Sequence, residues 1–264
     1  MRSDHRVSLL RRKHFSPALF SVTFHDSSLA REIAPGQFVM LDLPGRVRPY
    51  LRRAYSVADA DAASGEIEFL VKMVGPGTAA LADLPQGSAV SLLGPLGNEF
   101  SLEGLQPGER VAVVAGGIGA APFPFLFKSL ARAGIAADFY LGGRNAMELS
   151  LRARFERIVP GRIALATDDG SVGERGFVTD LFRRRAAQAD YSRLYACGPM
   201  PMFAALAPIV SHLALPSQFS TEAAMGCGIG ACLGCVIPGV EKPFIISCTE
   251  GPILPPEKIA WGKL

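Results

Sequence analysis

The sequence predicts a multidomain β plus α/β protein. A six-stranded antiparallel barrel is expected over residues 1–103, a parallel α/β domain over 104–215 and a small C-terminal segment over 216–264. Three observations predict this order. Apolar residues alternate in short runs through the first hundred residues, strand runs alternate with helical runs in the next hundred, and the last fifty residues are rich in glycine, proline and cysteine. These last residues have too little periodic apolar content for a core of their own.

The barrel is predicted from about six short runs of strand character. "LFSVTFHD" places Phe20, Val22 and Phe24 on one face of a strand, and "EIEFLVKMV" alternates in the same way. Glycine, proline and aspartate separate the runs. A small antiparallel barrel is the natural closure, because strands that pair all the way round leave no exposed edge.

The α/β domain begins where the period of the apolar residues changes, after "LQPGER". "RVAVVAGGIGAAP" indicates a strand that enters a glycine turn, "FPFLFKSLARAG" an amphipathic helix ending at Gly134, and "IAADFYLGGR" the next strand. Further strands are expected at "GRIALATDD" and "RLYACGP", with helices around 177–188 and 200–213. Strands that alternate with helices form a parallel sheet covered on both faces.

Charge and hydropathy exclude several classes of protein. The 27 basic and 24 acidic residues are spread along the chain and give a net charge of +3, so we expect no nucleic-acid partner. Glycine and proline interrupt the uncharged stretch 111–127, and the N-terminus has no apolar run of signal-peptide length; we therefore expect no membrane association and a cytoplasmic location. No serine, histidine and acid combination suggests a hydrolase. The four histidines do not have the spacing of metal ligands: His5, His14, His25 and His212.

The cysteines carry the most specific signal. In "MGCGIGACLGC", Cys227, Cys232 and Cys235 follow the spacing C-x4-C-x2-C, and Cys248 in "IISCTEGPIL" supplies a fourth thiolate. This is the plant-type [2Fe-2S] arrangement, in which glycines let backbone N–H groups approach the sulfides. Two alternatives are weaker. Structural zinc usually uses two short C-x2-C loops, of which only one is present, and a disulfide is unusual in a reducing compartment.

A second group of motifs lies in the predicted barrel. "RRAYSVAD" at 52–59 places an arginine, a tyrosine and a serine on one strand, and "EFLVKMVGPGT" at 68–78 ends in a turn that can begin a helix. An arginine can hold a diphosphate, a tyrosine can stack on a flat ring, and free N–H groups at a helix start can face phosphate. A strand followed by an ordinary turn is the plain alternative.

A third motif indicates that a nucleotide site is possible. "GGIGAAP" at 116–122 follows a predicted strand and opens a helix, the context in which a glycine turn admits a pyrophosphate, although it does not match G-x-G-x-x-G. "YACGPMPM" places Cys197 and Gly198 at the end of another strand, where ligands bind in such sheets. Cys197 could equally be a small buried residue.

These motifs together resemble a known family. "RAYS", "GPGT", "GPLGNEF", "GGIGAAP", "TDDGSVGERGFVTD", "CGPMPM", "CGIGACLGC" and "CTEGP" occur in order along nearly the whole chain. They resemble the electron-transfer subunits of the NAD-dependent, two-subunit dihydroorotate dehydrogenases, which belong to the ferredoxin reductase superfamily. The resemblance implies FAD on the barrel, NAD(H) as co-substrate on the α/β domain, and a [2Fe-2S] cluster on the C-terminal segment.

The resemblance also implies site residues. The implied FAD contacts are Arg53, Ala54, Tyr55, Ser56, Leu70, Val71, Lys72, Gly77 and Thr78. The glycine turn and the strand end described above make Gly116, Gly117, Gly119, Cys197 and Gly198 the candidate nucleotide-binding residues, and the cysteine spacing makes Cys227, Cys232, Cys235 and Cys248 the candidate cluster ligands. Ala54 stands where the family often has proline. Arg144, just after a predicted strand, is a cation that could accept a 2′-phosphate, so the choice between NAD and NADP stays open.

The function implied by the resemblance follows from these groups. Nicotinamide exchanges two electrons as hydride, a [2Fe-2S] cluster carries one, and FAD can exchange both, so no catalytic acid or base is expected in this chain. A barrel that oxidises dihydroorotate would need about 250 residues of its own. The implied partner is therefore an FMN-containing catalytic subunit, in a heterotetramer of two copies of each, in pyrimidine (UMP) biosynthesis. The alternative is the same reductase module serving a ferredoxin, a sulfide dehydrogenase or an oxygenase; a zinc-bearing interaction protein is a different class.

Overall fold

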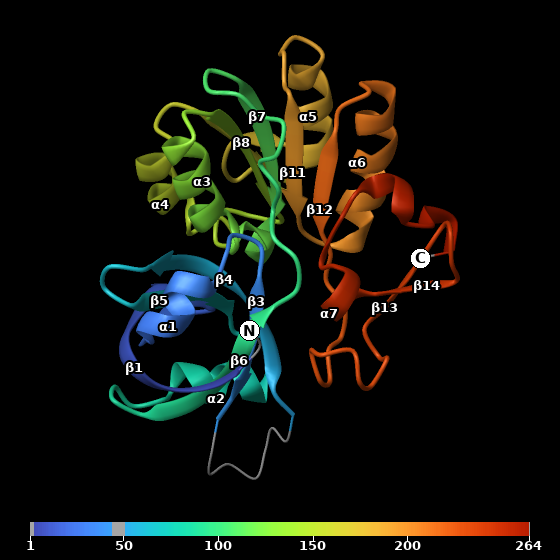
Figure 1. Ribbon diagram of the computed structural model, residues 1–264. Coiled ribbons are helices and arrows are strands. Elements are labelled where there is room, and N and C mark those ends of the chain that lie inside the picture. The colour runs from blue at the N-terminus through green and yellow to red at the C-terminus, as the bar shows by residue number, and fades with distance from the viewer. Residues whose placement is uncertain (1–2, 44–50, 264) are drawn as a thin grey trace.

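The N-terminal part of the computed structural model is a closed antiparallel barrel with the strand order β1-β2-β5-β4-β3-β6 (Figure 1). The structure describes residues 3–43 and 51–263. The strands are β1 (Ser3–Ser16), β2 (Leu19–His25), β3 (Phe38–Asp42), β4 (Arg53–Asp61), β5 (Glu66–Lys72) and β6 (Ala89–Leu96), and the helices are α1 (Ser27–Glu32) and α2 (Pro76–Ala82). The predicted inward face of β2, Phe20, Val22 and Phe24, is fully buried. The six-stranded barrel is therefore confirmed.

A seven-stranded sheet follows, with the order β10-β9-β8-β7-β11-β12-β15. Its strands are β7 (Arg110–Gly116), β8 (Ala136–Gly143), β9 (Ile163–Thr167), β10 (Glu174–Arg175), β11 (Arg193–Cys197), β12 (Ser217–Ser220) and β15 (Ile253–Leu254). All neighbouring pairs are parallel except β12 with β15. The helices are η1 (Gly117–Ala120), α3 (Phe123–Arg132), α4 (Arg152–Ile158), α5 (Val178–Ala186) and α6 (Met200–His212). The predicted parallel α/β arrangement is confirmed.

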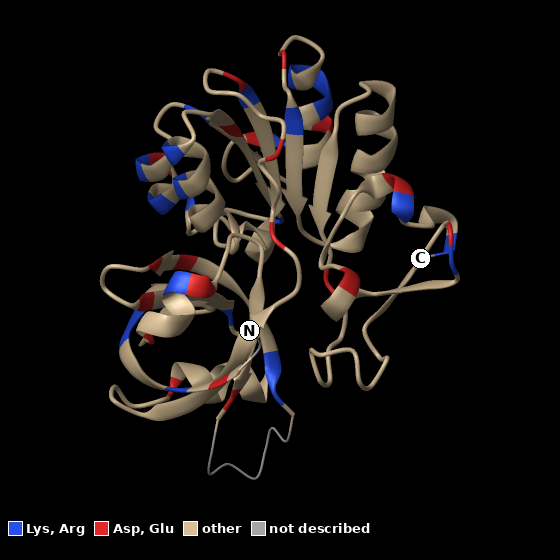
Figure 2. Cartoon of the chain, in the orientation of Figure 1, with Lys and Arg blue, Asp and Glu red and all other residues tan. Residues whose placement is uncertain are grey.

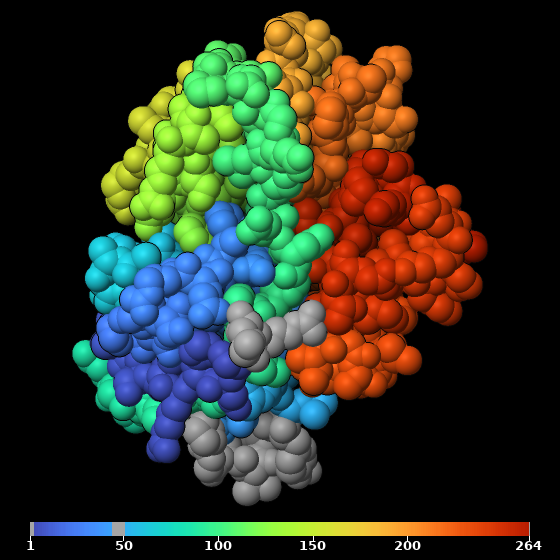
Figure 3. Space-filling view, viewed as in Figure 1, coloured from blue at the N-terminus to red at the C-terminus, as the bar shows by residue number. Residues whose placement is uncertain are grey.

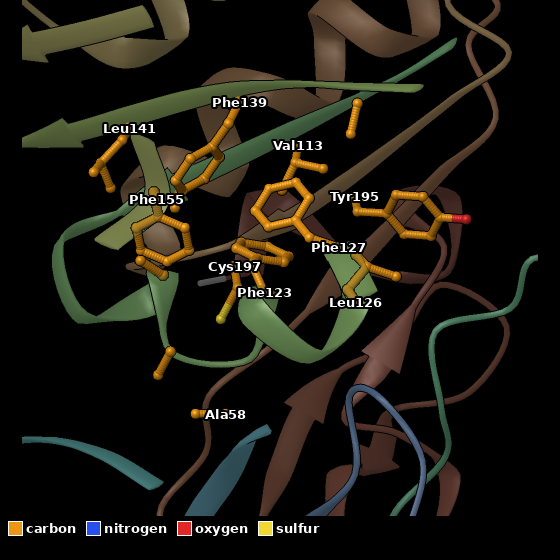
Figure 4. Packing of buried hydrophobic residues seen from close by; sticks show 14 of the residues in the cluster. Ala58, Val113, Phe123, Leu126, Phe127, Phe139, Leu141, Phe155, Tyr195 and Cys197 are labelled. Carbon is orange, nitrogen blue, oxygen red and sulfur yellow. The ribbon is translucent and has the colours of Figure 1, made fainter. Parts of the chain in front are cut away.

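The central strand β7 explains why this sheet needs helices on both faces. Val111 and Val113 are buried in one apolar cluster with α3 and α4, whereas Ala112 and Val114 are buried in another with α5 and α6. A strand buried on both sides is continuously apolar in sequence. Figure 4 shows the phenylalanines of the first cluster around Val113, where the rings of Phe127 and Phe139 lie 5.2 Å apart.

The C-terminal segment packs against both domains (Figure 3). It contains β13 (Val236–Pro238), β14 (Phe244–Ile246), α7 (Ser247–Glu250), η2 (Pro256–Lys258) and η3 (Trp261–Lys263). Cys235 and Cys248 share a buried apolar cluster with Met40 and other side chains of the barrel. Asn98, just after β6, donates from its amide to the carbonyl of Ile253 at 2.7 Å and accepts from the Ile253 N–H at 2.9 Å. On the other side, β15 pairs with β12 of the sheet. These contacts hold the segment in place, and it also has a small buried apolar cluster of its own, which the sequence did not lead us to expect: Ile237, Ile245, Leu254 and Ile259.

The boundaries of the parts remain a proposal. The predicted division after residue 103 falls between β6 and β7. The predicted division after residue 215 comes before β12, which pairs with β11 inside the sheet. We therefore propose that the α/β domain runs through Ser220.

No helix in the described part of the chain has the length and apolar character needed to cross a membrane.

Ion pairs join the barrel to the α/β domain. They are Arg154 with Glu68, Lys128 with Asp59, and Lys72 with Glu148. The first is bidentate, with N···O distances of 2.8 and 2.6 Å, and both side chains are less than one-fifth exposed. A bidentate and partly buried pair restricts orientation as well as distance. The two domains are therefore held in one relative placement.

Replacing Glu148 with glutamine should lower the free energy of unfolding by about 2 kcal/mol at neutral pH. This figure is smaller than the full equivalent of the pKa shift of Glu148, because the Arg144 guanidinium is exposed and solvent screens the pair. The hydrogen-bonded Arg144 side chain, helped by its backbone N–H and by Lys72, holds the pKa of Glu148 at about 2, below the ordinary 4.5. Because the folded-state pKa is depressed, the stabilisation is present above pH 4.5 and is lost as the pH falls toward 2. Denaturant unfolding of the wild type and the variant measures the loss of stability at pH 7 and at pH 3.

The matched control is Glu174→Gln, which removes a carboxylate paired with arginines on the surface of one domain, where its side chain is 44% exposed. An exposed pair is worth roughly 0–1 kcal/mol. A loss from Glu148→Gln that is the same at both pH values would contradict the prediction.

Candidate functional site

A first cavity of about 550 Å³ opens between the barrel and the sheet. All the residues expected to contact FAD line it: Arg53, Ala54, Tyr55, Ser56, Leu70, Val71, Lys72, Gly77 and Thr78. The rest of its lining is Val74, Gly75, Pro76, Ile118, Ala121, Pro122, Cys197 and Glu222. The structure thus brings together two motifs from neighbouring barrel strands and adds a wall from the α/β domain, which sequence reasoning missed.

Arg53 lies directly over the first turn of α2. A β-carbon at Gly77 would collide with the Arg53 guanidinium, so only glycine permits this approach. The guanidinium is held in place because its Nη1 donates to the Leu51 carbonyl at 2.7 Å. The Thr78 hydroxyl accepts hydrogen bonds from the N–H groups of Val74 and Gly75 at 2.9 and 3.1 Å, so it closes the turn. A fixed cation above a tight backbone turn fits the diphosphate of FAD.

Tyr55 offers the cavity a flat, uncharged ring. It packs edge to face against Phe69, with ring centroids 6.4 Å apart. Burial raises the pKa of the Tyr55 phenol to about 12, so the hydroxyl stays protonated at neutral pH and is available as a hydrogen-bond donor. An apolar ring with a neutral polar tip fits a planar aromatic cofactor.

A second cavity, of about 530 Å³, lies at the carboxyl edge of the sheet. Gly116, Gly117, Gly119 and Gly198 line it, as expected for the nicotinamide nucleotide, whereas Cys197 lies on the wall of the first cavity. The turns after β7 and β11 touch each other here: a β-carbon at Gly119 would collide with the carbonyl of Cys197. The two glycine turns therefore leave bare backbone facing the cavity, which fits a pyrophosphate.

The two cavities share a wall. Lys72, Ile118 and Glu222 line both of them. Glu222 comes just after β12 and is exposed to the cavities, yet the surrounding protein desolvates its carboxyl group and raises its pKa. Burial, followed by the nearby Glu222 carboxylate, raises the pKa of the Cys197 thiol, so this cysteine is not a thiolate. Sequence reasoning missed Glu222, although its place after a strand of the sheet was an available signal.

The predicted cluster ligands lie in two neighbouring pairs. The Sγ atom of Cys227 accepts from the N–H of Cys232 at 3.4 Å, and that of Cys235 accepts from the N–H of Cys248 at 3.4 Å. Cys235 and Cys248 are buried, Cys227 is half-buried and Cys232 is exposed. Within residues 3–43 and 51–263, no three such side chains stand together as a metal centre. The assignment of all four as ligands remains a prediction.

The donor set of this loop nevertheless fits an iron–sulfur cluster. Backbone N–H groups, first that of Ile229 and then that of Cys232, hold the pKa of Cys227 at about 6. Burial raises the pKa of Cys248 to about 11, which opposes its ionisation, so the fit of the loop rests on its backbone donors. Gly230 has a φ of +83° and lies against Thr249, where a β-carbon would come within 2.9 Å. Bare backbone donors around sulfur are what such a cluster requires.

Comparison with protein families agrees with these three sites. The family model described as the iron–sulfur cluster binding domain of dihydroorotate dehydrogenase B matches residues 222–260. The oxidoreductase FAD-binding domain matches residues 8–100, and the oxidoreductase NAD-binding domain matches residues 113–207. The chain therefore contains FAD-binding, NAD-binding and iron–sulfur binding domains in the order that was expected.

Similar proteins match over nearly the whole chain. The electron transfer subunit of dihydroorotate dehydrogenase B (NAD(+)) from Desulforamulus reducens is 34% identical, covering 93% of this chain and 94% of that protein. The subunit of the same name from Bacillus caldolyticus is 36% identical, covering 94% and 95%. A solved structure of NADH-dependent reduced ferredoxin-NADP oxidoreductase has a TM-score of 0.86 and 26% identity, covering 98% of this chain and 91% of that one. The chain belongs to the family of electron transfer subunits of dihydroorotate dehydrogenase B (NAD(+)).

Proposed function

We propose that this chain passes electrons between NAD(H) and a separate catalytic subunit that oxidises dihydroorotate, as a step of pyrimidine biosynthesis. The observation that carries the proposal is the shared wall of Lys72, Ile118 and Glu222, which lets two ligands meet between the domains. When bound, FAD supplies exchange of a hydride with nicotinamide and of single electrons with a [2Fe-2S] cluster. The residues of this chain position those groups and need donate no catalytic proton.

On the barrel side, Arg53 binds the FAD diphosphate and Tyr55 lies along its ring. On the sheet side, the turn Gly117–Ala120 and Gly198 admit the pyrophosphate of the nucleotide through bare backbone. Cys197 remains a neutral thiol at the carboxyl end of β11, where it helps to keep the site dry. These roles follow from the lining of the two cavities and from the contacts described above.

The loop with the four cysteines is proposed to hold the cluster and to face the partner. Its buried pair, Cys235 and Cys248, packs on the barrel, whereas Cys232 faces outward. Residues 223–240 include no charged residue, and Figure 2 shows this loop as uncharged. Large exposed apolar side chains lie in or beside it: Ile229, Leu233, Val236, Val240 and Phe244. We propose that the catalytic subunit, carrying FMN, docks here, with two copies of each subunit in the complex.

The location proposed for this complex is the cytoplasm. All five cysteines are free, and free thiols are typical of a reducing compartment.

The test is to purify the chain anaerobically, record its visible spectrum and measure iron, sulfide and zinc. FAD and [2Fe-2S] absorption, bleached by NADH, is expected. The chain is then mixed with the FMN subunit, and NAD reduction with dihydroorotate is measured. A colourless, zinc-bearing protein would contradict the proposal. Full NADH-dependent reduction of a ferredoxin, with no activity toward dihydroorotate, would favour the alternative suggested by the similarity to NADH-dependent reduced ferredoxin-NADP oxidoreductase.

A further inference from the structure

The buried hydroxyl of Ser247 has no hydrogen-bond partner among the residues that the structure describes. Its side chain is fully buried at the start of α7, and its Oγ atom is closed off from solvent. Buried hydroxyl groups in proteins almost always have a partner, because losing water without a replacement is costly. An unpaired hydroxyl at this place therefore points to a group that the protein binds.

Ser247 stands between two of the predicted cluster ligands. It directly precedes Cys248 in the chain, so the Cα atoms of these two residues are about 3.8 Å apart. The Ser247 N–H donates to the carbonyl of Cys235 at 2.8 Å, and the Cys248 N–H donates to the Sγ atom of Cys235 at 3.4 Å. Both cysteines are buried. The serine is thus held against the two buried ligands of the proposed cluster.

The two nucleotides that this chain is proposed to bind cannot supply the partner. Ser247 lines neither the flavin cavity nor the nucleotide cavity. The proposed cluster is the one bound group that would lie beside it, since the adjacent residue is a ligand. The sulfurs of a [2Fe-2S] cluster carry negative charge and accept hydrogen bonds, and these bonds help to set the reduction potential. A cluster sulfur is therefore the acceptor that fits the Ser247 hydroxyl.

We infer that the Ser247 hydroxyl donates a hydrogen bond to a sulfur of the cluster and thereby raises the reduction potential of the cluster. An added electron makes the sulfurs more negative, so the bond stabilises the reduced cluster more than the oxidised one. A higher potential makes the cluster a better electron acceptor. The inference rests on the proposed function, because it takes the four cysteines to be ligands of a [2Fe-2S] cluster.

The experiment compares the full chain, purified anaerobically with its cofactors, with the variants Ser247→Ala and Ser247→Thr. Iron and sulfide content are measured first, and the midpoint potential of the cluster is then measured by redox titration followed by electron paramagnetic resonance. Ser247→Ala removes the donor and should disfavour reduction roughly tenfold, which lowers the potential of a one-electron couple by about 59 mV. Ser247→Thr keeps a hydroxyl and should keep a potential near that of the wild type.

Two control variants separate this effect from the general loss of a hydroxyl group. Thr249→Val acts two residues further on, on an exposed residue whose hydroxyl already donates to the Ile246 carbonyl at 3.4 Å. Ser150→Ala removes the other buried hydroxyl that lacks a partner in the described part of the chain, and this residue lies in the α/β domain before α4. Both controls should keep the wild-type potential.

An unchanged potential in Ser247→Ala would overturn the inference, as would an equal fall in Thr249→Val. If Ser247→Ala loses its iron, Ser247→Thr decides: a retained cluster supports the hydrogen bond, and loss of iron from both variants overturns it. The wild type tests the proposed function separately. A wild type without iron and sulfide defeats the proposed cluster and the inference together, whereas a wild-type cluster whose potential does not respond to Ser247→Ala defeats the inference alone.

Discussion

Replacing Cys232 with serine is expected to remove iron and inorganic sulfide from the chain and to abolish electron transfer to the catalytic subunit. NADH-dependent reduction of small artificial acceptors should continue, because the flavin and nucleotide cavities do not include this loop. The measurements are iron and sulfide content, NADH–acceptor turnover, and dihydroorotate-dependent NAD reduction by a complex whose assembly is confirmed by gel filtration.

Cys232 suits this test better than Cys235, which is 1% exposed and packs in an apolar cluster with barrel residues such as Met40. Serine at Cys235 would disturb packing as well as ligation, and loss of a metal ligand is often loss of folding free energy. The control is Cys197→Ser, which should keep its iron. An assembled, cluster-free complex that still reduces NAD from dihydroorotate at the normal rate would show that the electrons take another route.

Replacing Gly77 with alanine is expected to weaken FAD binding by roughly 10- to 100-fold, about as much as Arg53→Ala, since a charge-assisted hydrogen bond is worth about 1.5–3 kcal/mol. The added β-carbon would occupy the position of the Arg53 guanidinium and force it away from the first turn of α2. The dissociation constant of FAD, measured by the quenching of flavin fluorescence, gives the size of each loss.

The double variant tests the cause. If Gly77→Ala acts by displacing Arg53, then adding it to Arg53→Ala should cost little more, because residues in contact couple strongly. Two losses that simply add would mean that the β-carbon acts independently of the guanidinium. Unchanged FAD affinity in all three variants would count against the first cavity as the flavin site.

Much of the fold could be predicted because its signals are local. β2 and β5 alternate apolar and polar residues in sequence, although the structure also buries Ser21 and Thr23 of β2, and β7 shows the continuous apolar run of a strand buried on both faces. The cysteine spacing and the glycine turns were equally visible, since each motif occupies a few consecutive residues. The strands, the cysteine motif and the glycine turns could therefore be predicted before their arrangement in space was known.

The residues that were missed are single acidic side chains. Glu148, Asp168 and Glu222 come from three separate loops, and only the topology of the sheet places them around one cavity. No spacing rule distinguishes them from other surface carboxylates. The short strands β10 and β15 were missed for a different reason, because two residues are too few to show a period.

The place of β15 in the sheet has a consequence for synthesis on the ribosome. β12 pairs with β11 on one side and with Ile253–Leu254 on the other, so the sheet is finished only when those late residues emerge. Until then, Ser217–Ser220 is an open edge that can pair with a strand of another nascent chain. A premature stop just before residue 253 would leave that edge permanently exposed, and such a chain should aggregate although both of its nucleotide-binding cavities are already encoded.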